Sequence, residues 1–370
     1  MKYYVIAGEA SGDLHASNLI RELKVSDPSA QFRGWGGDLM AAQGCQLVRH
    51  YRDLAFMGFA EVVANLRTIL RNLTFCKEDI KAFNPDVVIF VDYPGFNLRI
   101  AEFAHRSGFR TVYYISPQVW AWKESRVRQI KQHVDRMLVI LPFEQDFYRK
   151  HDYPSHFVGH PLLDAIEQYR LTKTDDFASS SDARPIIALL PGSRKQEIRT
   201  MLPVMLSVVS KFPEYRFVIA AAPSQELSFY SEMLGNSGIE IVQGATYDLL
   251  RKAHAALVTS GTATLEAALF GVPEVVCYKA NPISYRIAKA LVKIDFISLV
   301  NLIMGREVVK ELIQGAFNQW ELEQELRKIV DGPDRRSMIE DYSLLREKLG
   351  GPGASVKSAS LIQEFVRSDR

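Results

Sequence analysis

The stretch Thr259–Pro273 (TSGTATLEAALFGVP) holds the residues whose types and spacing best suit ligand chemistry. The apolar run Ala255–Val258 before it predicts a buried strand, and Gly271 with Pro273 would end the helix that follows. A strand, a turn of small residues and a helix start bring several free N–H groups and the positive end of a helix dipole to one point, which suits a phosphate or diphosphate. Glu266, one turn into the helix, can accept hydrogen bonds from ribose hydroxyls. An ordinary strand–turn–helix unit with a capping Ser or Thr has the same pattern, so this stretch alone leaves both interpretations open.

A second candidate group is Asp92, which follows the apolar run Asp86–Val91. It would lie at the carboxyl end of a buried parallel strand, where open α/β sheets place their active sites. The alternative is a loop aspartate that binds the N–H groups of the next turn. Trp120 and Trp122 follow another predicted strand, Arg110–Ile115, and suggest a wall for an apolar or sugar ligand, although core packing would explain them equally well.

Length and composition narrow the class of protein. At 370 residues the chain can form two ordinary domains, and a net charge of +2 does not suggest a nucleic-acid binder. Its 3 cysteines show no CxxC spacing, so neither a zinc site nor a disulfide framework is expected, and a reducing cytoplasm fits. Met1–Gly8 reads as a first strand rather than a signal peptide. No window approaches about 18 consecutive apolar residues, so we expect no membrane span, which leaves binding to a membrane surface open.

The first half alternates predicted strands and helices. Ser11 is expected to cap a helix over Asp13–Lys24, after a Gly-containing loop that is not GxGxxG, and the chain has no Walker A sequence. The predicted strands are Tyr3–Ala7, Gln31–Trp35, Asp86–Val91, Arg110–Ile115 and Arg136–Leu141. The stretch Leu54–Leu73 has an apolar face too broad for a simple surface helix, with Arg67 and Arg71 on its polar side. It is either a core helix or a partly exposed surface that meets acyl chains or a membrane.

The second half repeats the alternation after the loop-like segment Leu171–Arg184. A strand over Pro185–Leu190 leads into the turn Pro191–Arg194, a second place that suits a phosphate. We therefore predict an α/β protein with two doubly wound, Rossmann-like domains that face each other across a cleft. The domains are expected over residues 1–170 and 185–345, with a C-terminal helix in 346–370 that packs back toward the first domain. A nucleotide on one side of a cleft and a base, Asp92, on the other describe a nucleotide-sugar glycosyltransferase of the GT-B type.

Several blocks of residues resemble those of lipid-A-disaccharide synthase, and together they cover nearly the whole chain. The blocks are Gly8–Asp13, Asp92–Asn97, Ser116–Trp122, Val158–Pro161, Leu190–Arg194, Ser260–Glu266 and Asn301–Arg306. The resemblance implies a metal-independent, inverting transfer from UDP-2,3-diacylglucosamine to the 6-hydroxyl of 2,3-diacylglucosamine 1-phosphate (lipid X). The products are the β(1→6) lipid A disaccharide 1-phosphate and UDP. It also implies a peripheral enzyme on the cytoplasmic face of the inner membrane. A homodimer is one assembly that the sequence leaves open.

Within this resemblance we expect Asp92 to be the general base, with Glu9 and Asp13 as rivals, and Arg194 to stabilise charge on the departing UDP. The chain has no Asp-x-Asp pair, so we expect no metal and no cofactor. The residues predicted to line the UDP site are Gly192, Ser193, Arg194, Ser260, Gly261, Thr262, Ala263, Thr264 and Glu266. Further predicted substrate contacts are Glu9, Ser11, Asp13, Asn97, Trp120, Trp122, Asn301 and Arg306. The chain departs from the family pattern at Val300, where Pro is expected, and at Glu274, where Met is usual.

Two other functions fit the same fold pattern. A UDP-sugar 2-epimerase would need several acid–base groups around one sugar and no acyl-binding surface, and the apolar stretch before Leu73 counts against it. A non-catalytic nucleotide-sugar or lipid-binding protein would not need Asp92 and Arg194 on opposite domains. Incubation with donor and acceptor separates the three, because only a transferase yields disaccharide and UDP.

Overall fold

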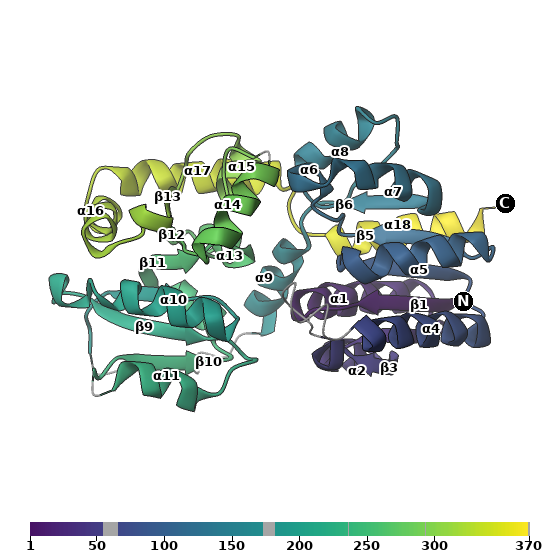
Figure 1. Cartoon of the computed structure of the whole chain (residues 1–370), viewed down its shortest axis with the longest axis horizontal. Coiled ribbons are helices and arrows are strands. Elements are labelled where there is room, and N and C mark those ends of the chain that lie inside the picture. The colour runs from purple at the N-terminus through teal and green to yellow at the C-terminus, as the bar shows by residue number, and fades with distance from the viewer. Residues whose placement is uncertain (55–65, 173–181, 236, 293, 369–370) are drawn as a thin grey trace. The chain divides into compact units, whose positions relative to one another are not determined.

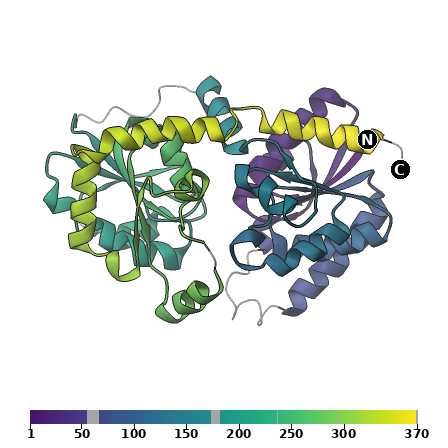
Figure 2. The same ribbon diagram turned by 90° about the horizontal axis from the view of Figure 1, so that it is seen from above.

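A computed structural model describes residues 1–54, 66–172, 182–235, 237–292 and 294–368. The chain forms two compact units (Figure 1): residues 1–167 together with 349–370, and residues 168–348. In each unit, helices cover both faces of a parallel sheet (Figure 2). The predicted class, α/β with two doubly wound Rossmann-like domains, is confirmed.

The first unit contains a seven-stranded sheet in the order β3-β2-β1-β4-β5-β6-β7. Its strands are β1 (Lys2–Ala7), β2 (Gln31–Gly36), β3 (Gln46–His50), β4 (Val87–Val91), β5 (Arg110–Tyr114), β6 (Arg136–Val139) and β7 (His156–Phe157). Its helices are α1 (Ala10–Ser26), α2 (Asp38–Ala42), α4 (Leu66–Phe83), α5 (Pro94–Arg106), α6 (Val119–Trp122), α7 (Val127–His133), α8 (Pro142–Arg149), α9 (Pro161–Thr172) and α18 (Ala354–Arg367). All five residues of β4 are buried, as expected for a strand covered on both faces.

The second unit contains a six-stranded sheet in the order β10-β9-β8-β11-β12-β13. Its strands are β8 (Ile186–Leu190), β9 (Arg216–Ala221), β10 (Glu240–Gln243), β11 (Ala253–Thr259), β12 (Glu274–Tyr278) and β13 (Lys310–Ile313). Its helices are α10 (Lys195–Leu206), α11 (Leu227–Leu234), α12 (Thr246–Lys252), α13 (Thr262–Leu269), α14 (Pro282–Leu291), α15 (Leu299–Met304), α16 (Gln319–Val330) and α17 (Asp334–Lys348).

The C-terminal helix α18 belongs to the first unit, where it lies beside α1 (Figure 2). The Gln363 amide donates to the carbonyl oxygen of Leu23 at 3.3 Å and to the Ser26 hydroxyl at 2.7 Å. The Asp164 carboxylate in α9 accepts from the backbone N–H of Gly353 and of Ser355 at the start of α18. These bonds fasten the end of the chain to the first sheet's helical layer.

The predicted start of α1 and the predicted end of β6 are wrong for local reasons. Helix α1 begins at Ala10 because the Asp13 N–H already donates to the Glu9 carbonyl at 2.9 Å, so Glu9 is the cap residue and Ser11 lies exposed in the first turn. Strand β6 ends at Val139, before the predicted Leu141, because the N–H groups of the next two residues donate to the Glu144 carboxylate at the start of α8.

The apolar stretch Leu54–Leu73 is described from Leu66 onward, and residues 55–65 lie outside the described part. In α4, Leu73 is buried in the core, whereas the Leu70 side chain is 54% exposed. Arg67 and Arg71 are exposed, as predicted. The described part of this stretch therefore combines a core face with an apolar side chain in solvent.

Candidate active site at the two topological switch points

In each sheet, two neighbouring strands lead into helices that run to opposite sides, and the crevice beyond their carboxyl ends is the usual ligand site of this fold. In the first unit these strands are β1 and β4, which pair in register with Ala7 opposite Val91. Glu9 and Asp92 therefore follow at the same edge. In the second unit they are β8 and β11, with Leu190 opposite Val258.

The turn after β8 and the turn after β11 also leave their sheet at one edge, because these strands are parallel neighbours. The first is Pro191–Arg194, and the second is Ser260–Gly261, which leads into α13. Each unit thus brings together two loops that the sequence analysis selected for their chemistry, although they are far apart along the chain.

Asp92 is half-buried at the end of β4. Burial, and to a smaller extent the nearby Glu9 carboxylate, raise the pKa of its carboxyl to about 7, while the Tyr93 N–H opposes the rise. A carboxylate with a pKa near neutrality is suited to accept a proton from a reacting group. Glu9 is also half-buried, so the two acidic groups interact at the mouth of the first switch point.

Asp13 and Asn97 have structural roles in place of the predicted substrate contacts. The buried Asp13 carboxylate accepts from the backbone N–H groups of Gly37, Leu39 and Met40 at 2.8, 3.1 and 3.1 Å, which holds the start of α2. The Asn97 amide is fully buried and donates to the Asp92 carbonyl at 2.7 Å. Ser11, from the same group of predictions, is exposed and lies in the first turn of α1.

Trp120 is half-buried near the end of β5, and its ring is fixed by a residue that the sequence analysis did not select. The indole N–H donates to Glu144 Oε1 at 3.2 Å, and the ring meets Phe143 edge-on at 4.9 Å between centroids. Burial raises the pKa of Glu144 to about 7. The signal for Glu144 was present, since a glutamate two residues after Pro142 is a typical helix-start residue. The Trp122 side chain lies outside the described part.

The turn after β8 ends at Arg194, the exposed cap residue of α10. Gly192 has a φ of +104°, and a side chain there would meet the Glu197 carboxylate, so this position needs glycine. Glu197 Oε2 accepts from the Ser193 N–H at 3.0 Å. Burial raises the pKa of the Tyr278 hydroxyl at the end of β12, and the positive charge of the Arg194 guanidinium opposes this rise.

The turn after β11 leads into α13, which starts at Thr262 with Gly261 as its cap residue. Gly261 and Thr262 are exposed and Ala263 is half-buried, so the first N–H groups of the helix, which lack intrahelical partners, are open to a ligand. The hydroxyls of Ser260 and Thr264 are used inside the fold, because they donate to the carbonyls of Ile297 and Gly261 at 2.9 and 2.8 Å.

Glu266, in the second turn of α13, is half-buried. The Tyr247 hydroxyl donates to its Oε1 at 3.1 Å. Burial raises the pKa of the Glu266 carboxyl, and the bond from Tyr247 lowers it. The bond from Tyr247 therefore orients the carboxylate and favours its ionised form against the effect of burial, a role that no local sequence pattern indicates.

Asn301 and Arg306 also serve the fold. The fully buried Asn301 side chain accepts from the N–H groups of Val308 and Val309 and donates to Glu311 Oε1 at 2.9 Å. Arg306 forms an ion pair with Asp341 in α17. These bonds tie α15 to β13 and the segment after it to α17. Asn301 is used inside the fold, whereas a substrate contact of the exposed Arg306 stays a prediction.

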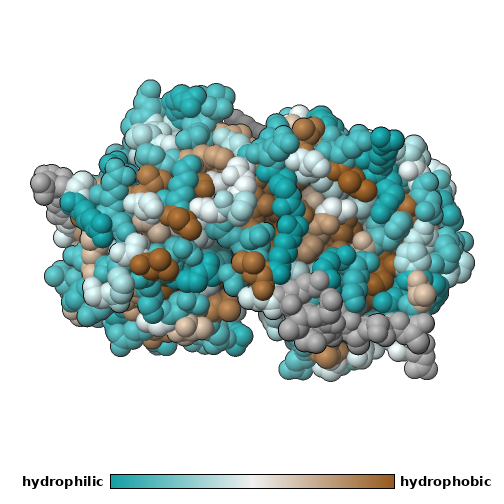
Figure 3. All heavy atoms as spheres, turned by 180° about the vertical axis from the view of Figure 1, so that it is seen from behind, coloured by the Kyte–Doolittle hydropathy of each residue, from teal (hydrophilic) through white to brown (hydrophobic). Residues whose placement is uncertain are grey.

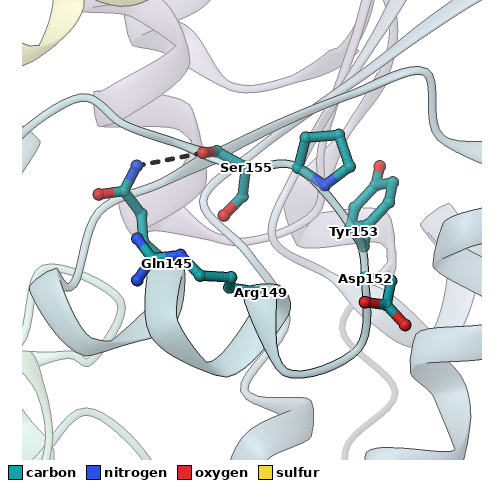
Figure 4. Close-up of a pocket in the computed structure, with 6 residues that line it drawn as sticks. Gln145, Arg149, Asp152, Tyr153 and Ser155 are labelled. Carbon is teal, nitrogen blue, oxygen red and sulfur yellow. Dashed lines mark hydrogen bonds between the residues drawn. The ribbon is translucent and has the colours of Figure 1, made fainter.

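A surface hollow of about 260 Å³ lies elsewhere (Figure 4), between α8 and the segment that enters β7. Gln145 donates there to the Ser155 carbonyl at 3.1 Å. This is the amino-terminal edge of the sheet, opposite to Asp92. Among the described residues, no group of three or more His, Cys, Asp or Glu side chains is placed to hold a metal ion.

Comparison with known proteins identifies the family. The model of the family described as lipid-A-disaccharide synthetase matches residues 3–365. The chain is 41% identical over 376 residues to the lipid-A-disaccharide synthase of Syntrophus aciditrophicus, with 98% of this chain and 97% of that protein covered. It is 38% identical over 375 residues to that of Myxococcus xanthus, covering 99% of this chain and 98% of that protein. The chain belongs to the lipid-A-disaccharide synthase family. The resemblance stated from the sequence blocks is thereby confirmed.

Solved structures share the fold of this family member at low sequence identity. One is the UDP-GlcNAc 2-epimerase of Neisseria meningitidis bound to UDP-GlcNAc, with a TM-score of 0.68, 14% identity and 100% of both chains covered. Another is the glycotransferase of kitacinnamycin, with a TM-score of 0.65, 18% identity and 98% of both chains covered. Because an epimerase and a glycosyltransferase match about equally well, the fold does not separate these two functions, whereas the family does.

Proposed function

We propose that the protein transfers the sugar of UDP-2,3-diacylglucosamine to the 6-hydroxyl of 2,3-diacylglucosamine 1-phosphate, with inversion. The products would be the β(1→6)-linked lipid A disaccharide 1-phosphate and UDP. The observation that carries the proposal is the family match over residues 3–365, since the relatives that match at this length are named lipid-A-disaccharide synthases. The protein is a glycosyltransferase of lipid A biosynthesis.

Asp92 is the proposed general base. The acceptor oxygen attacks the anomeric carbon, its proton passes to the Asp92 carboxylate, and the bond from the anomeric carbon to the diphosphate oxygen breaks. Assistance of this kind typically contributes 10²–10⁴ in rate. A pKa of about 7 supports the role, because a substantial fraction of the group is then ionised at neutral pH and the carboxylate is basic enough to take the proton.

The second unit provides the proposed UDP site. The open N–H groups at the start of α13 and the turn Gly192–Arg194 would bind the diphosphate, and Arg194 would stabilise the charge that develops as UDP leaves. Glu266 would accept from the ribose hydroxyls. Arg194 and the helix starts take the role that a metal ion has in other transferases.

Both proposed substrates carry acyl chains, so we propose that the protein works on the cytoplasmic face of the inner membrane. Among the described residues, no helix is long and apolar enough to cross a bilayer. On the face drawn in Figure 3, hydrophobic residues form separate patches among hydrophilic ones. Leu70 is exposed in α4, where Arg67 and Arg71 are exposed as well, so this is the side chain that we propose to meet acyl chains or lipid headgroups.

One assay tests the proposal: incubation with both substrates, followed by quantification of disaccharide and UDP. Asp92→Asn preserves the shape of the side chain and removes the base, so turnover should fall by about 10²–10⁴ while UDP still binds. Asp146→Asn is the matched control, because Asp146 is an exposed residue of α8 that pairs with Arg149. Glu9→Gln should cost less than Asp92→Asn.

Each other outcome has a defined meaning. Near-normal turnover of Asp92→Asn would show that Asp92 is not the base. A loss of UDP binding together with the loss of turnover would show that Asp92 has a structural role. Formation of epimerised UDP-sugar in the absence of acceptor would show that the protein is a UDP-sugar 2-epimerase and not a transferase. UDP-sugar binding without any turnover of the wild-type protein would favour a binding protein.

A further inference from the structure

The backbone of Asp92 has an unusual conformation. Asp92 and Tyr93 are consecutive residues with φ of +46° and +49°, in the left-handed region that residues other than glycine rarely adopt. Such a conformation carries an energetic cost and persists only where the surroundings enforce it. The turn therefore needs restraints that outweigh this cost.

Two buried side chains supply these restraints at one atom, the carbonyl oxygen of Asp92. The Tyr113 hydroxyl donates to it at 2.6 Å, and the Asn97 amide donates to it at 2.7 Å. Both side chains are fully buried. Tyr113 comes from β5, where it pairs with Phe90 of β4, and Asn97 comes from the first turn of α5.

The flanking groups restrain the same turn. The Asp92 N–H donates to the Tyr114 carbonyl of β5 at 3.3 Å, so both backbone groups of Asp92 are tied to that strand. The Tyr93 ring lies over Gly8, where an added Cβ would clash with the ring carbons. The turn is thus held from the loop after β1, from β5 and from α5.

We infer that Tyr113 and Asn97 form a clamp on the Asp92 carbonyl that holds the Asp92 carboxylate in its half-buried place beside Glu9. Tyr113 is then a positioning residue for the proposed reaction, acting through the backbone of Asp92 rather than on a substrate. The inference rests on the proposed role of Asp92 as the base. Release of the clamp would let the residue leave the left-handed region and turn its carboxylate toward solvent.

That movement has a signature in the pH profile. Burial is the largest cause of the raised pKa of Asp92, so a carboxylate that moves into solvent should titrate at lower pH. Among the described residues, the other titratable and charged groups that act on this turn are Glu9 before α1, the Tyr93 and Tyr113 hydroxyls, and Tyr148 and Arg126, which act on Tyr113. Substituting Tyr113 by Phe introduces no charge, so a shift of the profile reports the position of Asp92.

The experiment compares Tyr113→Phe with Tyr114→Phe. Tyr113→Phe keeps the ring and removes the donor, while Tyr114 is the next residue of β5, also fully buried, on the opposite face of the sheet. We expect Tyr113→Phe to lower kcat by about 10- to 100-fold, in line with a displaced catalytic group. The acid limb of kcat/KM should move to lower pH, and the Kd for UDP should not change. Replacement of Tyr113 by 4-aminophenylalanine, which retains a donor, should restore most of kcat.

The clamp is refuted if Tyr113→Phe and Tyr114→Phe share the wild-type kcat and pH profile. Should Tyr113→Phe not fold, Asn97→Ala removes the other donor, and an unchanged pH profile in that variant refutes the clamp equally. The failure of the clamp differs from that of the proposed function. If Asp92→Asn is inactive and Tyr113→Phe has normal activity, only the clamp is refuted. If Asp92→Asn is active, the role of Asp92 as the base is refuted.

Discussion

Glu274 begins β12 with a side chain that is fully buried in the second unit. Neither of its carboxyl oxygens has a hydrogen-bond partner among the described residues. Its surroundings include Met338 and Tyr342 of α17 and Cys277 of its own strand. Burial raises the pKa of Glu274 well above its usual range, so the folded protein holds this group protonated.

We predict that Glu274→Met stabilises the second unit, and that the gain grows with pH. An unfolded glutamate ionises near pH 4.3, whereas the buried one keeps its proton, so the folded state binds more protons and wild-type stability falls as pH rises above that value. Each pH unit over which only the folded state stays protonated costs about 1.4 kcal/mol. The unpaired carboxyl adds about 1–3 kcal/mol that does not depend on pH.

Calorimetric unfolding of the full chain at several pH values between 5 and 8 measures both effects. Glu274→Gln removes the ionisation and keeps a buried polar group, so its difference from wild type gives the pH-dependent part. The further gain of Glu274→Met over Glu274→Gln gives the pH-independent part. Glu307→Gln is the matched control, because Glu307 is an exposed residue of the same unit that pairs with Lys310 at 3.2 Å. Stability curves of wild type and Glu274→Met that run parallel over this pH range would refute the reasoning.

Three further predictions concern the site and the membrane. Arg194→Ala should lower turnover at least about 100-fold, because it removes one charge-stabilising donor worth roughly 2.7–4 kcal/mol. EDTA should leave the turnover of the wild-type protein unchanged. Mg²⁺-dependent activity that survives Arg194→Ala would contradict this prediction. Leu70→Ser should weaken binding to anionic vesicles in a sedimentation assay while short-chain substrates are still used; an equal loss for Leu227→Ser, an exposed leucine of the second unit, would show that the effect is unspecific. Tyr247→Phe removes a bond that lowers the pKa of Glu266, so the pKa of Glu266 should rise. UDP affinity, measured by calorimetric titration, should then fall about three- to tenfold, and the loss should be larger at pH 6 than at pH 8. Equal losses at both pH values would leave Tyr247 with a packing role only.

The sequence predicted the strands and the loops of the site because both follow from local patterns. The run Asp86–Val91 is almost entirely apolar, so it predicted a buried strand, with Asp92 at its carboxyl end; the observed strand is Val87–Val91. Likewise, small residues after β11 and a helical apolar pattern from Thr262 predicted the helix start at the second switch point. In a parallel sheet all carboxyl ends share an edge, so the order of strands and loops along the chain was enough to predict a ligand site there.

The roles of polar residues beside these loops depended on the tertiary structure. Asp13, Asn97 and Asn301 look like ligand contacts in the sequence, yet all three are buried and bind backbone groups of other segments. The composition of a motif does not tell whether an amide points to a ligand or into the fold, since that depends on which main-chain groups other segments leave unpaired.

The sequence by itself determined the fold class, the family and the positions of Asp92, Arg194 and Glu266 at strand or helix ends, because alternating apolar segments and the motif order encode them. Only the tertiary structure decided that Tyr113 holds the Asp92 carbonyl, that Tyr247 binds Glu266 and that Glu274 has no partner among the described residues. The physical reason is the same in each case. The register of parallel strands and the packing of helices bring together groups that lie about 20 to 70 positions apart along the chain, and no local pattern specifies which of them meet.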